Sequence, residues 1–202
     1  IDGASAPYFL NQPEQIRTPR LLVFKDRFDF NLQCIQSRLK KVNPELGMHS
    51  LWPHVKTTKS SWAVRRCINS GISFFKATMN EVDMLVASGA KNVFVSYPLL
   101  EHDARELAKN ILANPHMQFY IQVGHKKHVG FLQKILREFD VKWHYFIDVN
   151  VGMDRTGLPV EKALEMYRFL KNEEAFVFAG IHAYDGHVHQ VGENERRETA
   201  RQ

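Results

Sequence analysis

Apolar runs of strand length alternate with amphipathic segments of helical spacing along most of the chain. The short, nearly continuous apolar runs predict strands at residues 20–24, 51–56, 72–77, 92–97, 118–123, 143–149 and 176–182. The helical spacing predicts helices at residues 29–42, 79–87, 102–112, 126–139 and 160–170, and one more that begins at Ser60 or Ser61 and ends at Ser70-Gly71.

Apolar strands separated by helices predict an α/β protein whose parallel sheet is covered by helices. A doubly wound sheet and a (β/α) barrel of the TIM type both satisfy this pattern. The glycine-rich motifs G-x-G-x-x-G and G-x-x-x-x-G-K-[ST], which cradle nucleotide phosphates, do not occur in the chain. The commonest nucleotide-binding doubly wound folds are therefore not indicated, but the pattern alone leaves both architectures open.

The composition is that of one globular unit. With 202 residues, 44% of them apolar, the chain can bury a substantial core. Its apolar runs are shorter than the roughly 18 residues of a membrane span, and residues 1–17 lack the basic start and apolar stretch of a secretory signal. Cys34 and Cys67 lie in expected helices without a ligand pattern, so we expect no disulfide, no cysteine zinc site and a cytoplasmic location.

The formal net charge of +5 comes from lysines and arginines scattered along amphipathic helices. Such a charge favours weak attraction of anions, including a phosphate-bearing cofactor. Aromatic and basic residues do not alternate in the way that stacks nucleic-acid bases. We therefore expect a small-molecule partner, with neither nucleic acid nor a membrane.

Lys56 stands where an apolar run gives way to polar residues, in the sequence L-W-P-H-V-K-T-T-K-S (residues 51–60). The carboxyl ends of parallel strands face the ligand, so Lys56 is expected to project into a water-poor cavity. Desolvation there lowers the pKa of an amine, and the neutral amine can attack an aldehyde. The alternative is that Lys56 and Lys59 are surface lysines. By the two-residue strand period His54 shares the side of Lys56, either to position it or to pack inside the fold.

Polar residues also follow the last two strands. Residues 150–157, N-V-G-M-D-R-T-G, place Arg155 in a loop. Residues 182–189, H-A-Y-D-G-H-V-H, place His187 just after the last strand, and an imidazole suits acid–base catalysis because it titrates near neutral pH. A metal site at His187 and His189 lacks a third ligand that can be named, and His182 can equally be a hydrogen-bonded structural residue.

These motifs resemble those of the D-threonine aldolase and D-serine dehydratase family, relatives of alanine racemase among the fold-type III enzymes that bind pyridoxal 5′-phosphate (PLP). Residues 51–60 are similar to its R-P-H-x-K-T-H-K signature, residues 152–157 to G-M-x-R-x-G, and residues 184–187 to Y-x-G-H. The resemblance extends from Thr18 to His187, although Trp52 stands where arginine is usual and Thr58 where the second histidine is usual.

The resemblance implies a role for several residues. It implies that Lys56 carries PLP, that Arg155 lies near the phenolic oxygen of the cofactor, and that His187 handles the substrate hydroxyl. The alternative for Arg155 is a loop arginine paired with Asp154 or Asp148. The other residues expected to bind the cofactor are His54, Tyr97, Tyr184 and His182.

Other family-like stretches have simpler explanations. Residues 77–81, A-T-M-N-E, match the A-T-x-x-E stretch of the family, but Thr78 and Glu81 also form a capping box, which we prefer. Tyr97 belongs to a Y-P-L stretch and is expected to line the cofactor pocket without catalysing. Gln122 and Gly124 are expected only as pocket wall.

The resemblance favours a barrel of the alanine racemase N-terminal domain kind over a doubly wound sheet. Residues 1–202 are expected to form one PLP-binding (β/α) barrel domain of about six strand–helix units, where a closed barrel has eight. The domain is therefore expected to be truncated. In the family, a C-terminal β-domain supplies the ligands of a divalent metal (Mn or Zn), so we name no metal ligand in this chain; a homodimer is among the expected assemblies.

The implied function is that of a PLP-dependent lyase in D-amino acid metabolism, which cleaves D-threonine to glycine and acetaldehyde by a retro-aldol step. D-serine dehydratase and amino-acid racemase are alternatives that use the same cofactor. A PLP-binding homeostasis protein without strong catalysis is an alternative of another class. The short chain favours that alternative, whereas the P-H-V-K-T and Y-D-G-H stretches favour the aldolase group.

Overall fold

Strands and helices alternate along the chain, as predicted. The computed structural model describes residues 10–201; residues 1–9 and 202, which include the start of the predicted domain, lie outside the described residues. The helices are α1 (Lys25–Val42), α2 (Ser61–Asn69), α3 (Val82–Ser88), α4 (Glu101–Ala113), α5 (Lys126–Phe139), α6 (Ala163–Leu170) and α7 (Glu193–Thr199). The strands are β1 (Phe74–Ala77), β2 (Asn92–Val95), β3 (Gln118–Val123), β4 (Trp143–Asn150), β5 (Leu158–Pro159) and β6 (Phe176–Ala183).

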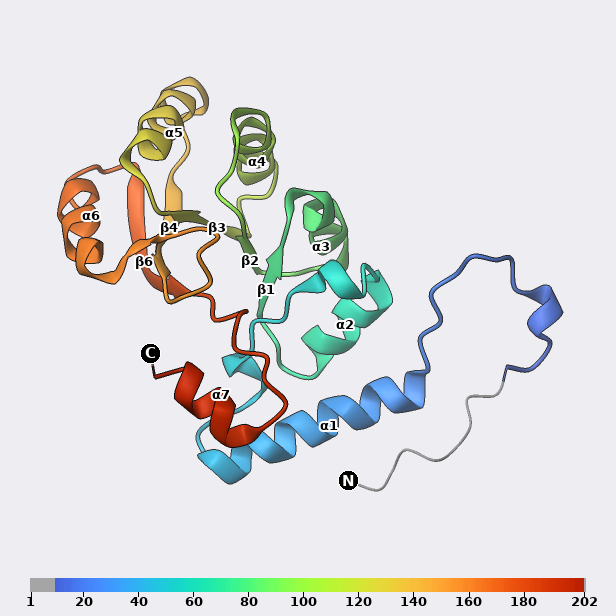
Figure 1. Ribbon diagram of the computed structural model, residues 1–202. Helices are drawn as coiled ribbons and strands as arrows, with labels where there is room; N and C mark the ends of the chain where they lie inside the picture. The colour runs from blue at the N-terminus through green and yellow to red at the C-terminus, as the bar shows by residue number, and fades with distance from the viewer. Residues whose placement is uncertain (1–9, 202) are drawn as a thin grey trace.

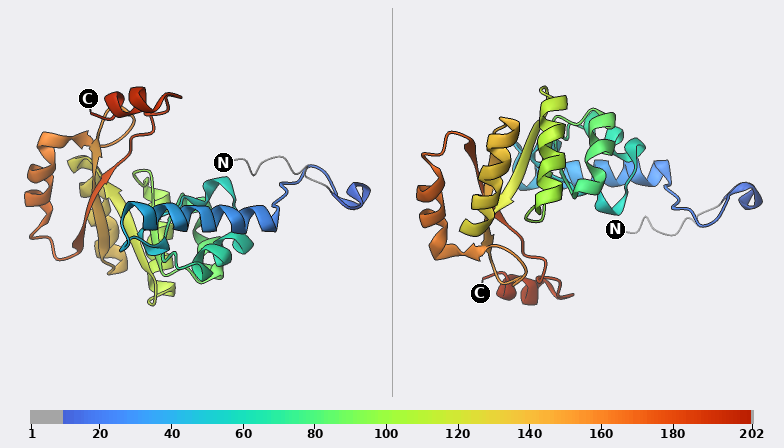
Figure 2. Two further views of the ribbon diagram at one scale, coloured as in Figure 1. Left: turned by 90° about the horizontal axis from the view of Figure 1, so that it is seen from below. Right: turned by 90° about the horizontal axis from the view of Figure 1, so that it is seen from above.

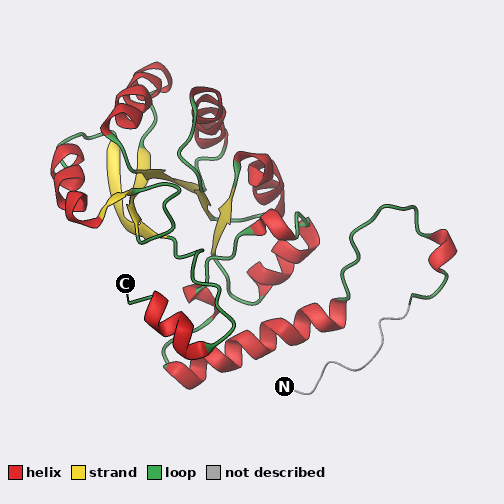
Figure 3. Cartoon of the chain, in the orientation of Figure 1, coloured by secondary structure: helices red, strands yellow, loops and turns green. Residues whose placement is uncertain are grey.

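The strands form one parallel sheet in the order β1-β2-β3-β4-β6, and the short β5 pairs with the end of β4. Figures 1 and 3 show α3, α4, α5 and α6 in a row along one side of this sheet. Each of these helices follows a strand and returns the chain to the start of the next, as a parallel sheet requires. The predicted parallel α/β architecture is confirmed.

The sheet is an open arc within the described residues. β1 pairs with β2 at one edge, and β6 pairs with β4 at the other. The sheet has six strands, which matches the predicted number of about six units, but its membership differs. Residues 51–56 do not form one of these strands, and β5 was not predicted.

The prediction of a strand at residues 20–24 is wrong. These residues lead into α1 without regular structure. Leu21, Leu22 and Val23 are all exposed, since no neighbouring strand covers them. A short apolar run does not form a strand without a partner to accept its backbone hydrogen bonds.

The prediction of a strand at residues 51–56 is also wrong, and the local chemistry explains why. Pro53 has no N–H to donate. The N–H of Lys56 donates to Nδ1 of His54 (3.2 Å), which turns the chain into a short 3₁₀ helix. An isolated bridge between His54 and Lys76 still holds this segment beside β1.

Alternate residues of each strand face two different layers. Phe75, Val93 and Ile121 face the helices in the main core and are 0% exposed. The inner face of the sheet carries a smaller aromatic cluster, made of Phe74, Phe94 and Phe146 with Tyr120. Trp52 stacks on Phe74 with ring centroids 3.8 Å apart. The residue that stands where the family has arginine therefore caps this aromatic cluster.

α1 lies outside the row of helices, as Figures 1 and 2 show. It packs on α2 through Phe28 and Trp62, whose ring centroids are 5.3 Å apart. Nε of Arg66 also donates to Oδ1 of Asp29 at 2.9 Å. None of the described helices combines the length and the apolar composition needed to cross a bilayer.

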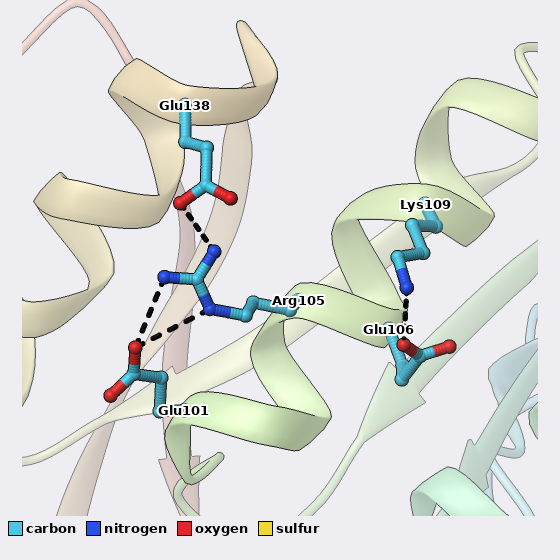
Figure 4. Close-up of polar contacts among 5 residues, drawn as sticks. All are labelled: Glu101, Arg105, Glu106, Lys109 and Glu138. Atoms are coloured by element: carbon cyan, nitrogen blue, oxygen red, sulfur yellow. Dashed lines mark hydrogen bonds and ion pairs between the residues drawn. The ribbon is translucent and has the colours of Figure 1, made fainter.

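Charged side chains join the outer surfaces of α4 and α5 (Figure 4). Arg105 of α4 donates to Glu101 one turn earlier (Nη2–Oε1, 3.0 Å) and forms an ion pair with Glu138 of α5. Lys109 pairs with Glu106 within α4 (2.6 Å). Exposed pairs of this kind contribute little to stability, so the buried leucines beneath them hold the two helices to the sheet.

Two of the predicted caps are confirmed. Oγ of Ser60 accepts a hydrogen bond from the N–H of Ala63 (3.4 Å), so Ser60 rather than Ser61 caps α2. Oε2 of Glu81 accepts from both the N–H (2.8 Å) and the hydroxyl (2.7 Å) of Thr78. The A-T-x-x-E stretch therefore has the structural role that we preferred.

Candidate functional site at the carboxyl ends of the strands

Polar side chains form a hydrogen-bonded chain at the carboxyl ends of the strands, on the inner face of the sheet. The N–H of Tyr97 donates to Oε1 of Gln122 (3.2 Å), and Nε2 of Gln122 donates to Oδ2 of Asp148 (3.0 Å). Oδ1 of Asp148 lies 2.6 Å from Nδ1 of His182. Nε2 of His182 lies 2.8 Å from Nζ of Lys76. The chain therefore links β1, β3, β4, β6 and the loop after β2, and we call it the polar chain.

The hydrogen-bond partners in the polar chain indicate which nitrogen of His182 carries a proton. Asp148 and Gln122 are each 2% exposed, so Asp148 depends on its two protein partners for hydrogen bonds. An ionised carboxylate can only accept, so the hydrogen bond assigns a proton to Nδ1 of His182. Nε2 of His182 then faces the amine of Lys76 and can accept a hydrogen bond from it.

Lys76 is the end of the polar chain and lies among aromatic rings. Its Nζ is 5.1 Å from the ring centroid of Phe94 and 5.8 Å from that of Tyr184. Burial is the main influence on the pKa of Lys76 and lowers it; Asp148 opposes this shift, whereas Arg155 adds to it. The amine therefore gives up its proton more readily than an exposed lysine.

Arg155 lies between two tyrosine rings. Its guanidinium carbon is 5.1 Å from the ring centroid of Tyr97 and 4.8 Å from that of Tyr184. No carboxylate among residues 10–201 forms an ion pair with Arg155, so the alternative pairing with Asp154 or Asp148 is not observed. Asp148 binds the polar chain instead, and Asp154 accepts a hydrogen bond from Asn150. The two rings hold the guanidinium while its hydrogen-bond donors stay available to an anion.

Tyr97 adopts a backbone conformation that side-chain-bearing residues rarely take, with φ 82°. Such a conformation persists only where surrounding contacts impose it. Here the N–H of Tyr97 is fixed by Gln122, and its ring contacts Arg155. The turn after β2 thus aims the tyrosine ring across the end of the sheet.

His54 lies at the same end of the sheet. Its Nε2 is 3.3 Å from Oγ of Ser96, just after β2. Burial, together with the charges of Lys56 and Lys76, lowers the pKa of His54 to about 4. His54 is therefore neutral at physiological pH and can accept a proton or a hydrogen bond.

Lys56 is exposed rather than held in the water-poor cavity that we predicted. The cause is the 3₁₀ turn, which sends the side chain away from the line of a strand. Lys56 nevertheless stays near the polar chain, because its N–H donates to His54 and His54 is bridged to Lys76. Its charge also lowers the pKa of both His54 and Lys76.

His187 lies apart from the polar chain, in the loop after β6. It packs against Gly152, where a Cβ would lie 2.9 Å from Nε2 of His187; Gly152 also has φ +101°. Its Nδ1 is buried without a hydrogen-bond partner among the described residues. His187 and Gly152 line a cleft of about 760 Å³ with Asp185 and with Thr199 at the end of α7.

The structure thus brings most of the predicted residues to one end of the sheet. His182 and Tyr184 contact Lys76, and a backbone bridge holds His54 beside it. Arg155 contacts Tyr97 and Tyr184. His187 lies beside the neighbouring cleft. Lys76 was not predicted from the sequence, and Asp148 was expected only as an alternative partner of Arg155. The signal for Lys76 was a single lysine inside an apolar strand, F-F-K-A (residues 74–77). In the part of the chain that the structure describes, no group of three or more His, Cys, Asp or Glu could hold a metal ion.

Comparison with protein families gives one match. A family model described as "Alanine racemase, N-terminal domain" matches residues 26–202. A search of curated proteins finds no match.

Solved structures share the fold. D-threonine aldolase from Filomicrobium marinum has a TM-score of 0.80 at 23% sequence identity, over 92% of this chain and 49% of that chain. A mutant D-threo-3-hydroxyaspartate dehydratase has a TM-score of 0.71 at 20% identity, over 86% of this chain and 44% of that chain. Alanine racemase of Clostridium difficile 630 has a TM-score of 0.69 at 14% identity, over 88% and 45%. The chain spans about half the length of these structures, and at such identities the similarity shows the fold alone.

Proposed function

This chain belongs to the alanine racemase N-terminal domain family, and on that premise we propose that it forms the cofactor-binding part of a PLP-dependent lyase that acts on D-β-hydroxy-amino acids. The proposed reaction is the retro-aldol cleavage of D-threonine to glycine and acetaldehyde. The observation that carries the proposal is the gathering of amines, imidazoles and a ring-held guanidinium at the carboxyl ends of a parallel sheet. The choice of the aldolase over its relatives rests on the stretches at residues 51–60 and 184–187.

The residues at the strand ends fit PLP by their chemistry. Lys56 carries an amine that can bond to an aldehyde carbon. Arg155 lacks an ion pair among the described residues and can balance a negative oxygen. The rings of Tyr97 and Tyr184 offer flat walls for an aromatic ring. When bound, PLP supplies an electron sink for the bond that breaks at the substrate α-carbon.

In this proposal Arg155 supplies a charge whose position is set before a ligand arrives. Both tyrosine rings contact the guanidinium, so little reorganisation is needed when negative charge develops beside it. A lysine there would present a single ammonium in place of the planar fork. Arg155→Lys should therefore weaken cofactor binding even though the charge is kept.

His187 is the proposed acid–base group for the substrate hydroxyl. His187 lines the adjoining cleft, where its ring can meet a ligand group. Lys56 is the proposed covalent attachment point for the cofactor, on the resemblance of residues 51–60. Its exposure leaves it accessible to a cofactor that enters from solvent.

An assay of products tests the proposal. Protein supplied with PLP, D-threonine and manganese is expected to release acetaldehyde, measured with alcohol dehydrogenase and NADH, and Lys56→Ala is expected to abolish that release. Lys59→Ala is the matched control, because Lys59 lies in the same loop and its exposed side chain pairs with Glu81 (3.4 Å). A keto acid as product would replace the aldolase by a dehydratase, and L-threonine as product would replace it by a racemase. Bound PLP with D-threonine and D-serine both unchanged would overturn the enzymatic proposal.

A further inference from the structure

Two lysines lie near the candidate site, and their surroundings differ. Lys56 is exposed on a 3₁₀ turn. Lys76 points from β1 to the inner face of the sheet, where it is partly buried between Phe94 and Tyr184. The proposed function assigns the covalent bond with PLP to Lys56 and gives Lys76 no role.

The contacts of Lys76 are those of a nucleophile with a base beside it. Nζ of Lys76 lies 2.8 Å from Nε2 of His182, and Nδ1 of His182 lies 2.6 Å from the buried carboxylate of Asp148. The carboxylate orients the imidazole and stabilises the positive charge that the imidazole gains when it takes a proton, as in other carboxylate–histidine–nucleophile arrangements. The second oxygen of Asp148 is held by Gln122, so the arrangement is supported from three strands.

Resting on the proposed function, we propose that Lys76 is a second nucleophilic amine of this site, with His182 and Asp148 as its base, and that it bonds to the aldehyde of PLP in exchange with Lys56. A lysine with a purely structural role on the inner face of the sheet would need only the hydrogen bond to His182. A partly buried amine beside an oriented imidazole can also lose its proton without releasing it to solvent.

The proposed step balances in atoms and protons. His182 takes one proton from the ammonium of Lys76, and the free nitrogen lone pair attacks the aldehyde carbon. The C=O bond breaks and a C=N bond forms. The oxygen leaves as water, which contains the proton that His182 returns and the second proton lost by the nitrogen. No oxidant or reductant takes part.

Borohydride trapping locates the amine that bonds to PLP. The protein is incubated with one equivalent of PLP and reduced with borohydride, and the pyridoxyl-bearing peptides are identified by mass spectrometry. We expect the label on both Lys56 and Lys76 in the wild-type chain, and on Lys76 in Lys56→Met. His182→Gln is expected to slow labelling of Lys76 about a hundredfold, the lower range for loss of a general base. Lys59, which is 62% exposed and ion-paired, reports the background at a surface lysine.

Each result separates this inference from the proposed function. Label on Lys56 but not on Lys76 would overturn the inference and leave the proposed function standing. Label on neither lysine above the level of Lys59 would overturn both. Labelling of Lys76 at an equal rate in the wild type and in His182→Gln would overturn the assignment of His182 as the base. The wild-type measurement decides the main point even if a variant fails to fold.

Discussion

Asp148→Asn tests whether the polar chain contributes to the stability of the fold. The hydrogen bonds along the chain have a fixed direction: Gln122 uses its oxygen for the N–H of Tyr97 and its amide nitrogen for Asp148. The carboxylate of Asp148 accepts from both Gln122 and His182. An asparagine keeps the shape but can accept at one end only, so its NH₂ must face one of these two donors.

The cost of this change follows from burial. Asp148 is 2% exposed, so water does not replace the lost partner. Loss of one hydrogen bond to a charged group, with a buried donor left unpaired, costs about 2–3 kcal/mol of unfolding free energy. For a chain of this length that corresponds to a fall of about 5–10 °C in Tm.

Thermal and urea unfolding followed by circular dichroism measure the effect. Asp154→Asn is the matched control, because Asp154 is exposed near the end of the same strand and its φ of 52° suits asparagine equally well. We expect the control to change stability by less than about 0.5 kcal/mol. Equal stability of Asp148→Asn and Asp154→Asn would refute the reasoning that the polar chain is held by an ionised acceptor.

Three further changes test other parts of the structure. Ser60→Ala should cost about 1 kcal/mol in urea unfolding, because the cap of α2 is lost; a similar loss in Ser61→Ala, which removes no cap, would argue against that cause. Leu132→Ala, at a residue 0% exposed, should cost about 2–5 kcal/mol, and Leu112→Ala, at a residue 54% exposed, should cost far less when both are unfolded in urea. His54 takes up its proton at about pH 4 in the folded chain but near its ordinary 6.5 in the unfolded chain. The free energy of unfolding of the wild type, measured with urea, should therefore fall between pH 6.5 and about 4, and that of His54→Asn should fall less. An equal fall in both proteins would contradict the buried neutral imidazole.

The sequence predicted some elements with their bounds. Residues 118–123 and 126–139 were predicted with the bounds that β3 and α5 have, since one is a short, mostly apolar run and the other is strongly amphipathic. Residues 51–56 have a similar apolar run, but the missing N–H of Pro53 and the hydrogen bond to His54 turn the chain. Here a side chain competes with a neighbouring strand for a backbone hydrogen bond. The outcome depends on three-dimensional geometry, which the spacing of apolar residues in the sequence does not reveal.

The candidate site was only partly predictable for a related reason. Motifs identified His182 and Arg155, because polar residues after apolar strands are informative by themselves. Lys76 gained its importance from Asp148 and His182, which are 72 and 106 residues away in number but adjacent across the inner face. That adjacency comes from the register of the sheet, in which Asp148 pairs with His182.

The central claim is that this chain binds PLP through a lysine at the carboxyl ends of its strands, and an absorbance titration with PLP tests it most directly. The account predicts a violet-region absorption band that saturates at one equivalent of PLP, is bleached by borohydride, and is lost when Lys56 and Lys76 are both replaced by methionine. A band that persists in the double variant, or its absence from the wild-type protein, would contradict the account.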